Sequence, residues 1–250
     1  MAIVFGKRSS YLWNKAWGAI TLIALLLLPL VLISVFGRYV AEVGYVGLFV
    51  VVALMLIVLT VIESRKKFIY RLAGGMEGEE QIVDELKKLP DEYVVIRGLK
   101  VKERMDVDCT VVGPTGVYAV EVKSHKGRIE FNGQALTRNG QRFQKDFIKQ
   151  VSSEAVLLRE KIRHLAKLDL FVEAILVFSS KYASVHFGTQ NIKGCRVIGR
   201  EWLNELLETG SVQRLEHIHI LKIVEALTVE VPDKQMNAKM AKLRNVLGLN

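Results

Sequence analysis

The chain has 250 residues, 35 of them Lys or Arg and 26 Asp or Glu, which gives a formal net charge of +9, and 50% are hydrophobic. This hydrophobic share is high for a purely soluble protein. The two cysteines have neither CxxC nor metal-ligand spacing, which fits a reducing cytosol and indicates that both are small apolar packing residues. The sequence also shows no glycine-rich phosphate loop and no Ser–His–Asp or Cys–His arrangement.

Two long apolar segments lie near the start of the chain. Residues 16–36 and 43–62 contain no charged side chain, and each is long enough as a helix to cross about 30 Å of hydrocarbon. Only residues 37–42 separate them, which predicts a tight transmembrane hairpin. Basic residues flank its outer ends, so the positive-inside rule places both chain termini in the cytoplasm. These residues are Lys7, Arg8, Lys15, Arg65, Lys66, Lys67 and Arg71.

The predicted organisation is a multi-pass cell-membrane protein anchored in the lipid bilayer through residues 16–62. A cytoplasmic tail over 1–15 and a juxtamembrane linker over 63–74 flank the anchor. A cytoplasmic domain is expected over 75–200, and a helical extension over 201–250, whose role the sequence does not specify.

The elements expected after the anchor mix helices with strands, which predicts an α/β (α+β) domain with a mixed sheet. They are a helix over 76–89, a strand over 93–99, a hairpin over 106–123, a strand over 128–131, a loop over 132–140, a helix over 143–165, strands over 171–178 and 195–198, and helices over 201–208, 214–227 and 233–247. In the first helix, Glu79 shares the apolar stripe of Ile82 and Val83. An acid on that side needs a partner, unless it only adds favourable charge near the helix N-terminus.

The hairpin over 106–123 brings acidic residues together. If Val112 pairs with Val117 across the turn, alternation places Asp108 opposite Glu121 and Asp106 opposite Lys123. Two facing carboxylates repel each other in a sheet, and a divalent cation between them would remove the conflict. The pattern therefore indicates a metal site with an ammonium group beside it, although a chance combination of common residues remains an alternative.

Basic residues cluster in sequence around this hairpin and favour a polyanionic partner such as nucleic acid, against the alternative of a scattered basic surface. Lys126, Arg128, Lys145 and Lys149 are the candidates for phosphate contacts. In the long helix over 143–165, Gln150 lies beside the apolar stripe. It is placed either to hydrogen-bond toward an active site or to cover the edge of the stripe.

An ordered set of residues resembles the NERD (nuclease-related) domain, which is similar to the PD-(D/E)XK, or restriction-endonuclease-like, superfamily. The set covers about residues 75–150. It consists of Gly75-Met-Glu-Gly78-Glu79, Asp108, Val111-Val112-Gly113-Pro114-x-Gly116-Val117, Glu121-Val122-Lys123 and Gly127. Family members commonly continue with Asn-Pro-x-x-Gln, and here Gln150 is kept while Asp146-Phe147 replaces Asn-Pro.

The resemblance implies a restriction-endonuclease-like core and metal-assisted hydrolysis of phosphodiester bonds, with Mg²⁺ as the cofactor and Mn²⁺ as an alternative ion. It implies that Asp108 and Glu121 bind the ion and that Glu79 completes the acidic cluster. Lys123 would orient or deprotonate the attacking water and stabilise charge on the phosphate. Gln150 would position Lys123 or the substrate.

The first hypothesis is therefore a membrane-anchored nuclease that acts on nucleic acid, DNA in preference to RNA, at the cytoplasmic face. The second is a catalytically silent, membrane-tethered module of the same fold that binds nucleic acid or protein. A third is a membrane scaffold whose two apolar helices associate into an oligomer through small residues such as Gly44 and Gly47.

Overall fold

The computed structural model describes residues 1–6, 49, 53, 56, 60, 75–103, 105–210, 213–231 and 233–249. The chain divides into two compact units, one formed by residues 1–8 and 78–250 and the other by residues 9–77. Within the described residues, no helix combines the length and the apolar character that a membrane crossing requires. The predicted spans over 16–36 and 43–62 lie outside the described residues, apart from Phe49, Ala53, Leu56 and Thr60.

A mixed seven-stranded sheet in the order β1-β2-β3-β4-β8-β11-β10 forms the centre of the first unit. Its strands are β1 (Ile3–Phe5), β2 (Val94–Lys102), β3 (Met105–Gly113), β4 (Gly116–Lys123), β8 (Val172–Phe178), β10 (Asn191–Ile192) and β11 (Cys195–Gly199). β2, β3 and β4 form an antiparallel meander. β4, β8 and β11 are parallel, and each of the seven residues of β8 is buried, as expected for a strand covered on both faces.

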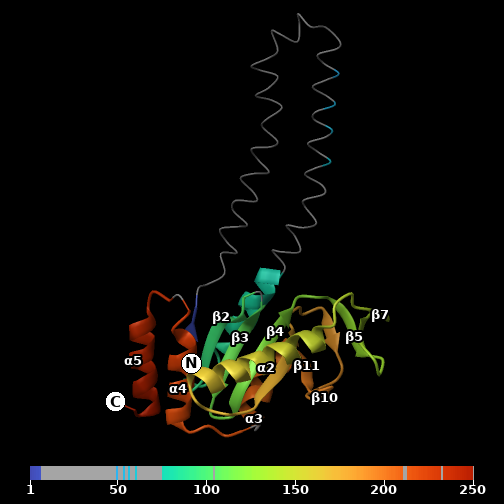
Figure 1. Cartoon of the computed structure of the whole chain (residues 1–250). Helices are drawn as coiled ribbons and strands as arrows, with labels where there is room; N and C mark the ends of the chain where they lie inside the picture. Colours follow the sequence, from blue (N-terminus) through green and yellow to red (C-terminus); the bar gives the residue numbers. More distant parts are fainter. Residues whose placement is uncertain are drawn as a thin grey trace, which may run out of the picture. The chain divides into compact units, whose positions relative to one another are not determined.

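Helices cover both faces of this sheet. They are the helix over residues 75–86, α2 (Phe147–Leu165), the 3₁₀ helix η1 (Arg200–Trp202), α3 (Leu203–Thr209), α4 (His217–Thr228) and α5 (Met236–Leu247). Alternation along β4 sends Val117 and Ala119 into the core beneath α2 and α4, while Tyr118 and Val120 pack with the helix over 75–86 and with α3. Figure 1 shows α2 crossing one face of the sheet.

A second, four-stranded sheet has the order β7-β6-β5-β9. It consists of β5 (Gly127–Phe131), β6 (Leu136–Arg138), β7 (Gln141–Arg142) and β9 (Ala183–Val185). β5 follows β4 after three residues, and β9 follows β8 after four, so two neighbouring strands of the large sheet continue into the small one. In Figure 1 the small sheet and the α4–α5 pair lie at opposite sides of the domain.

The predicted α/β class with a mixed sheet is confirmed, and several details are corrected. The segment over 132–140, expected to be a loop, contains β6, which hydrogen-bonds to β5 as a hairpin. The helix expected from residue 143 begins at Phe147, because Asp146 caps it by accepting a hydrogen bond from the Lys149 N–H. Residues Ile3–Phe5, where the sequence predicts no element, form β1, which pairs in parallel with β2.

Candidate active site

The β3–β4 hairpin brings Asp108 and Glu121 to one end of the large sheet. The predicted register, Val112 opposite Val117, is the one observed, and the ladder between the strands continues to Cys109 opposite Val120. Beyond that pair the Asp108 side chain replaces the backbone as the hydrogen-bond acceptor, since its Oδ2 accepts a 2.8 Å hydrogen bond from the Val122 N–H. The predicted placement of Asp106 opposite Lys123 is wrong, because the ladder has already ended and Asp106 pairs with Lys100 of β2.

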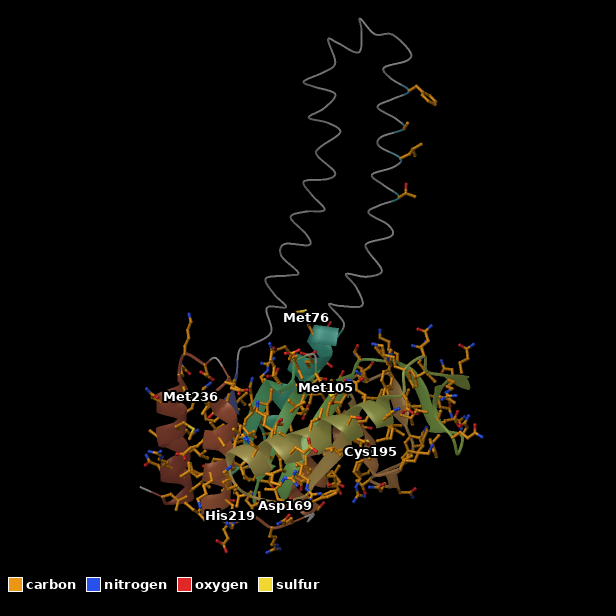
Figure 2. All side chains as sticks on the ribbon, viewed as in Figure 1. Met76, Met105, Asp169, Cys195, His219 and Met236 are labelled. Carbon is orange, nitrogen blue, oxygen red and sulfur yellow. The ribbon has the colours of Figure 1, made fainter. Side chains whose placement is uncertain are left out.

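This end of the sheet is where the parallel strands β4 and β8 both finish. The Ser179 N–H donates a 3.0 Å hydrogen bond to the Lys123 carbonyl, which holds the two exits together. In Figure 2, Met105 at the start of β3 marks this end of the sheet, and Asp169, just before β8, marks the opposite end. Open α/β sheets place their ligand sites beyond the carboxyl ends of parallel strands, and the predicted site occupies such a position.

Glu121 is the most deeply buried of the predicted acids, and the residue is only 3% exposed. Its Oε1 accepts a 2.7 Å hydrogen bond from Gln150 Nε2 and forms an ion pair with Lys123 Nζ. Its Oε2 is buried and accepts a hydrogen bond from no described residue. A buried carboxylate oxygen without a partner is costly, so this atom calls for an additional cation or donor.

Gln150 links Glu121 to a second buried acid that the sequence analysis missed. The amide Nε2 of Gln150 also donates a 2.9 Å hydrogen bond to Glu154 Oε1, one turn further along α2. Glu154 is 1% exposed, and its Oε2 likewise finds no partner among the described residues. A signal for it was present, because Glu154 lies on the helical stripe of Val151 and Leu158, where an acid is unusual.

Lys123 stands beside these carboxylates with its ammonium group held from two sides. Its Nζ pairs with Glu121 and lies 4.8 Å from the centre of the Phe147 ring. His125 stacks on Phe147 at a centroid distance of 5.6 Å and lies tilted against Phe143 at 5.1 Å. Burial lowers the pKa of His125, and the charges of Arg138 and Lys123 lower it further, so this imidazole is neutral at pH 7.

Glu79 reaches the cluster from the helix over 75–86. Burial raises its pKa, the Arg97 guanidinium opposes that rise, and the Glu121 charge adds to it. Gly78 lets this helix approach the strand ends closely. A Cβ at that position would lie 3.1 Å from the Cβ of Ser124 and would clash with the Ser179 hydroxyl.

Two carboxyl groups of the cluster titrate far from their usual range. Burial raises the pKa of Asp108 to about 8, the Glu121 charge acts in the same direction, and the Val122 N–H opposes both. Burial also raises the pKa of Glu154 to about 8, again with the Glu121 charge as the second cause. Without a metal ion the cluster therefore holds protons at neutral pH that these carboxyls would release in water.

The four residues predicted to contact phosphate lie outside the carboxylate cluster, on the surface. Lys126, Arg128, Lys145 and Lys149 are all exposed. Arg128 forms a 2.8 Å ion pair with Glu130 of the same strand, and Lys126 Nζ lies 5.3 Å from the centre of the Tyr182 ring. Arg128 lies in β5 of the small sheet, and Lys149 lies in the first turn of α2.

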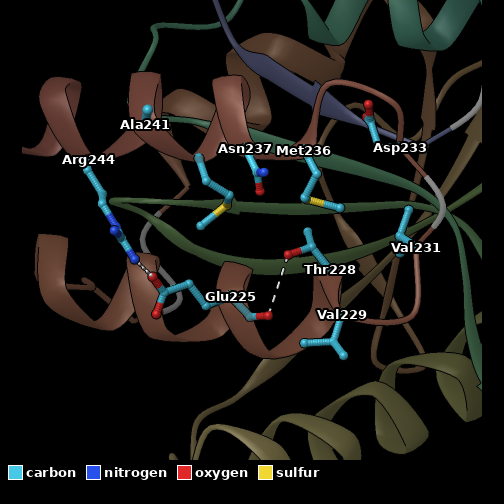
Figure 3. A pocket seen from close by; sticks show the side chains of 10 residues that line it. Glu225, Thr228, Val229, Val231, Asp233, Met236, Asn237, Ala241 and Arg244 are labelled. Atoms are coloured by element: carbon cyan, nitrogen blue, oxygen red, sulfur yellow. Dashed lines mark hydrogen bonds and ion pairs between the residues drawn. The ribbon is translucent and has the colours of Figure 1, made fainter.

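The metal ligands predicted from the sequence are near one another but do not form a complete set of ligands around one point. Among the described residues, no three carboxylate, imidazole or thiolate groups converge as a ligand set for one ion. A cavity of about 670 Å³ is found elsewhere, between α4 and α5, and none of the predicted site residues lines it (Figure 3). The candidate site is therefore identified by its cluster of buried carboxylates beside Lys123, and not by the volume of a cavity.

Comparison with known proteins gives one family. Residues 74–179 match the family described as NERD, nuclease-related domain. No curated protein and no solved structure matches the chain significantly. The matched segment contains all five predicted catalytic residues and Glu154. It ends at residue 179, directly after β8 and beside the site. This chain therefore carries a nuclease-related domain over residues 74–179.

Proposed function

We propose that this domain hydrolyses phosphodiester bonds of nucleic acid, DNA in preference to RNA, with the help of Mg²⁺ or Mn²⁺. The observation that carries the proposal is the buried, unpartnered Oε2 of Glu121, next to Asp108 and Lys123 on the same hairpin. Two carboxylates and a lysine supply the groups that metal-assisted hydrolysis needs. The match to the nuclease-related family supports this reading, and we propose that the domain has a restriction-endonuclease-like core.

The residues present fit a divalent ion of the magnesium type. Mg²⁺ binds protein through one or two carboxylates and keeps several waters, so Asp108 and Glu121 suffice and a closed cage is unnecessary. Both acids reach one end of the sheet from adjacent strands, and Glu79 adds negative charge nearby. When bound, the ion supplies Lewis-acid stabilisation and favours an ionised water at neutral pH.

Lys123 has two tasks in this proposal. Without the ion its ammonium group neutralises Glu121, and with substrate present the same group stabilises negative charge that develops on the phosphate. The Phe147 ring, 4.8 Å away, keeps the ammonium group over the site instead of in solvent.

Gln150 and Glu154 act as positioning residues. The Gln150 amide fixes Glu121 Oε1 at 2.7 Å and is itself fixed by Glu154 at 2.9 Å. The other oxygen of Glu121, which finds no hydrogen-bond partner among the described residues, remains available for a cation.

We also propose, from the sequence alone, that residues 16–36 and 43–62 anchor the domain in a cell membrane with both termini cytoplasmic. Separation of cell membranes from soluble protein tests this. Retention in the membrane fraction after an alkaline carbonate wash is the expected result, and release by that wash would contradict it.

The second candidate is a catalytically silent module of the same fold that binds nucleic acid or protein. One observation favours it: Lys123 already neutralises Glu121, so the cluster has an internal cation. Cleavage assays separate the two candidates, because the silent module would bind nucleic acid without turnover.

The test is incubation of the full chain with labelled single-stranded and duplex DNA and RNA, with Mg²⁺ or with EDTA. We expect cleavage only with Mg²⁺, and loss of at least about 100-fold in rate for Glu121→Gln and for Lys123→Met. Glu225→Gln, at a half-buried α4 residue that pairs with Arg244, and Lys222→Met, at an exposed one, are the controls and should keep the rate. Cleavage that survives both site substitutions, or that EDTA does not affect, would overturn the proposal.

A further inference from the structure

Two chain segments leave the candidate active site side by side and enter the small sheet. β4 ends at Lys123, three residues before Lys126, and Ser179, the first residue after β8, lies three residues before Tyr182. The Gly127 N–H donates a 2.9 Å hydrogen bond to the Tyr182 carbonyl, so the two segments remain paired. Three residues span at most about 10 Å, which keeps Lys126 and Tyr182 close to the carboxylate cluster.

Tyr182 is a large aromatic side chain that the fold leaves in solvent. It is 62% exposed, and two ammonium groups lie near its ring, Lys126 Nζ at 5.3 Å and Lys181 Nζ at 5.1 Å from the ring centre. An exposed ring with flanking cations suits a nucleotide, because the ring stacks on a base while the ammonium groups bind its phosphates.

The segments that form the small sheet, together with those next to them in sequence, are strongly basic. Over residues 124–149 and 180–193 the sequence has eight basic residues, all exposed, and two acidic ones. The basic residues are Lys126, Arg128, Arg138, Arg142, Lys145, Lys149, Lys181 and Lys193. Both acids are engaged, since Glu130 pairs with Arg128 and Asp146 caps α2. This excess of positive charge favours a polyanion over a protein partner of mixed charge.

We infer that Tyr182, Lys126 and Lys181 form a stacking platform for an unpaired base of a nucleic acid strand that continues to the carboxylate cluster. Lys181 and Tyr182 follow the segment that matches the nuclease-related family, which ends at residue 179. A paired base in a duplex cannot offer its face to a tyrosine without leaving the stack. The preferred ligand is therefore single-stranded nucleic acid, or a duplex with an unpaired flank. The inference rests on the proposed function only in taking nucleic acid as the polymer.

Binding without cleavage tests the platform. The full chain in EDTA is titrated into a fluorescently labelled single-stranded oligonucleotide and into the matching duplex, and anisotropy is recorded at several salt concentrations. Tyr182→Ala should weaken binding of the single strand about 5- to 100-fold, whereas Tyr182→Phe keeps the ring and should stay within about twofold of the original affinity. Lys126→Ala and Lys181→Ala should each reduce, by about 0.7, the steepness with which the logarithm of the binding constant falls against the logarithm of the salt concentration.

Phe171→Ala is the matched control, because Phe171 is also an exposed aromatic residue, 51% exposed, and lies just before β8 at the other end of the strand. It should leave affinity unchanged within about twofold. Equal binding by Tyr182→Ala and Phe171→Ala, or equal loss of single-strand and duplex binding in Tyr182→Ala, would overturn the platform. If Tyr182→Ala weakens single-strand binding but the protein shows no Mg²⁺-dependent cleavage, the nuclease proposal alone is refuted. If the protein cleaves nucleic acid but Tyr182→Ala binds the single strand with unchanged affinity, the platform alone is refuted.

Discussion

Replacing Asp108 with asparagine should stabilise the metal-free protein at alkaline pH. Burial, helped by the Glu121 charge, raises the pKa of Asp108 to about 8, so the folded protein resists ionisation of this carboxyl. Asparagine has nearly the same shape and still offers an oxygen to the Val122 N–H, which donates to Asp108 at 2.8 Å. The substitution therefore removes the titration while keeping the hydrogen bond.

The magnitude follows from linkage between protonation and folding. The pKa is raised in the folded state, so the stability that this carboxyl contributes is complete below its unfolded value, 3.8, and is lost as pH rises through about 8. Each pKa unit corresponds to about 1.4 kcal/mol, so the three units from pH 5 to pH 8 give an upper limit of about 4 kcal/mol. Partial access of Asp108 to solvent reduces this, and we expect about 2 kcal/mol.

Urea unfolding in EDTA at pH 5, 7 and 9 measures this effect. The original protein should lose stability across the series, and Asp108→Asn should lose about 2 kcal/mol less. Mg²⁺ should restore stability at pH 9 in the original protein and not in Asp108→Asn, because the ion binds the ionised carboxylate. An identical pH dependence in both proteins would refute the role given to Asp108.

Two further substitutions test the packing and protonation of the site. Gly78→Ala should cost about 1–3 kcal/mol in urea unfolding, because its Cβ clashes with the Ser179 hydroxyl. Ser179→Ala should rescue part of this cost, since Cβ then meets Cβ at 3.5 Å while the 3.1 Å contact with the Ser124 Cβ remains. Gly75→Ala, with open space around it, is the control, and simple additivity of the two substitutions would count against the close contact. Glu154→Gln should flatten the fall in thermal stability between pH 6 and pH 9, because it removes a carboxyl with a pKa of about 8 that burial and Glu121 raise above 4.5. An unchanged pH profile would show that Glu154 does not hold its proton.

The parts of the site that depend on local geometry could be predicted from the sequence. A four-residue turn and the period of two along each strand determine the register of the β3–β4 hairpin, which places Asp108 near Glu121 and Lys123. Gln150 could be placed at the edge of the apolar stripe of α2 because helical periodicity needs no knowledge of the tertiary fold.

Features that arise from contacts between distant segments could not be predicted in this way. β1 joins the large sheet through parallel pairing with β2, about 90 residues later in the chain, and three residues carry no periodic signal. The small sheet is built from strands of two to five residues, so the segment over 132–140 appeared to be a loop. Glu154 was overlooked because an acid on a helix usually faces water, although its place on the apolar stripe indicated burial.

The central claim is that Asp108 and Glu121 together bind a divalent cation. Titration of the full chain with Mn²⁺, followed by the electron paramagnetic resonance signal of the free ion, measures this directly. We predict one site per chain that Mg²⁺ competes for, with affinity falling at least about tenfold in Asp108→Asn and in Glu121→Gln. The affinity should be unchanged in the control Glu225→Gln, which changes a residue of α4. A chain that binds no Mn²⁺, or that binds it equally well after both acids have been replaced, would contradict the claim.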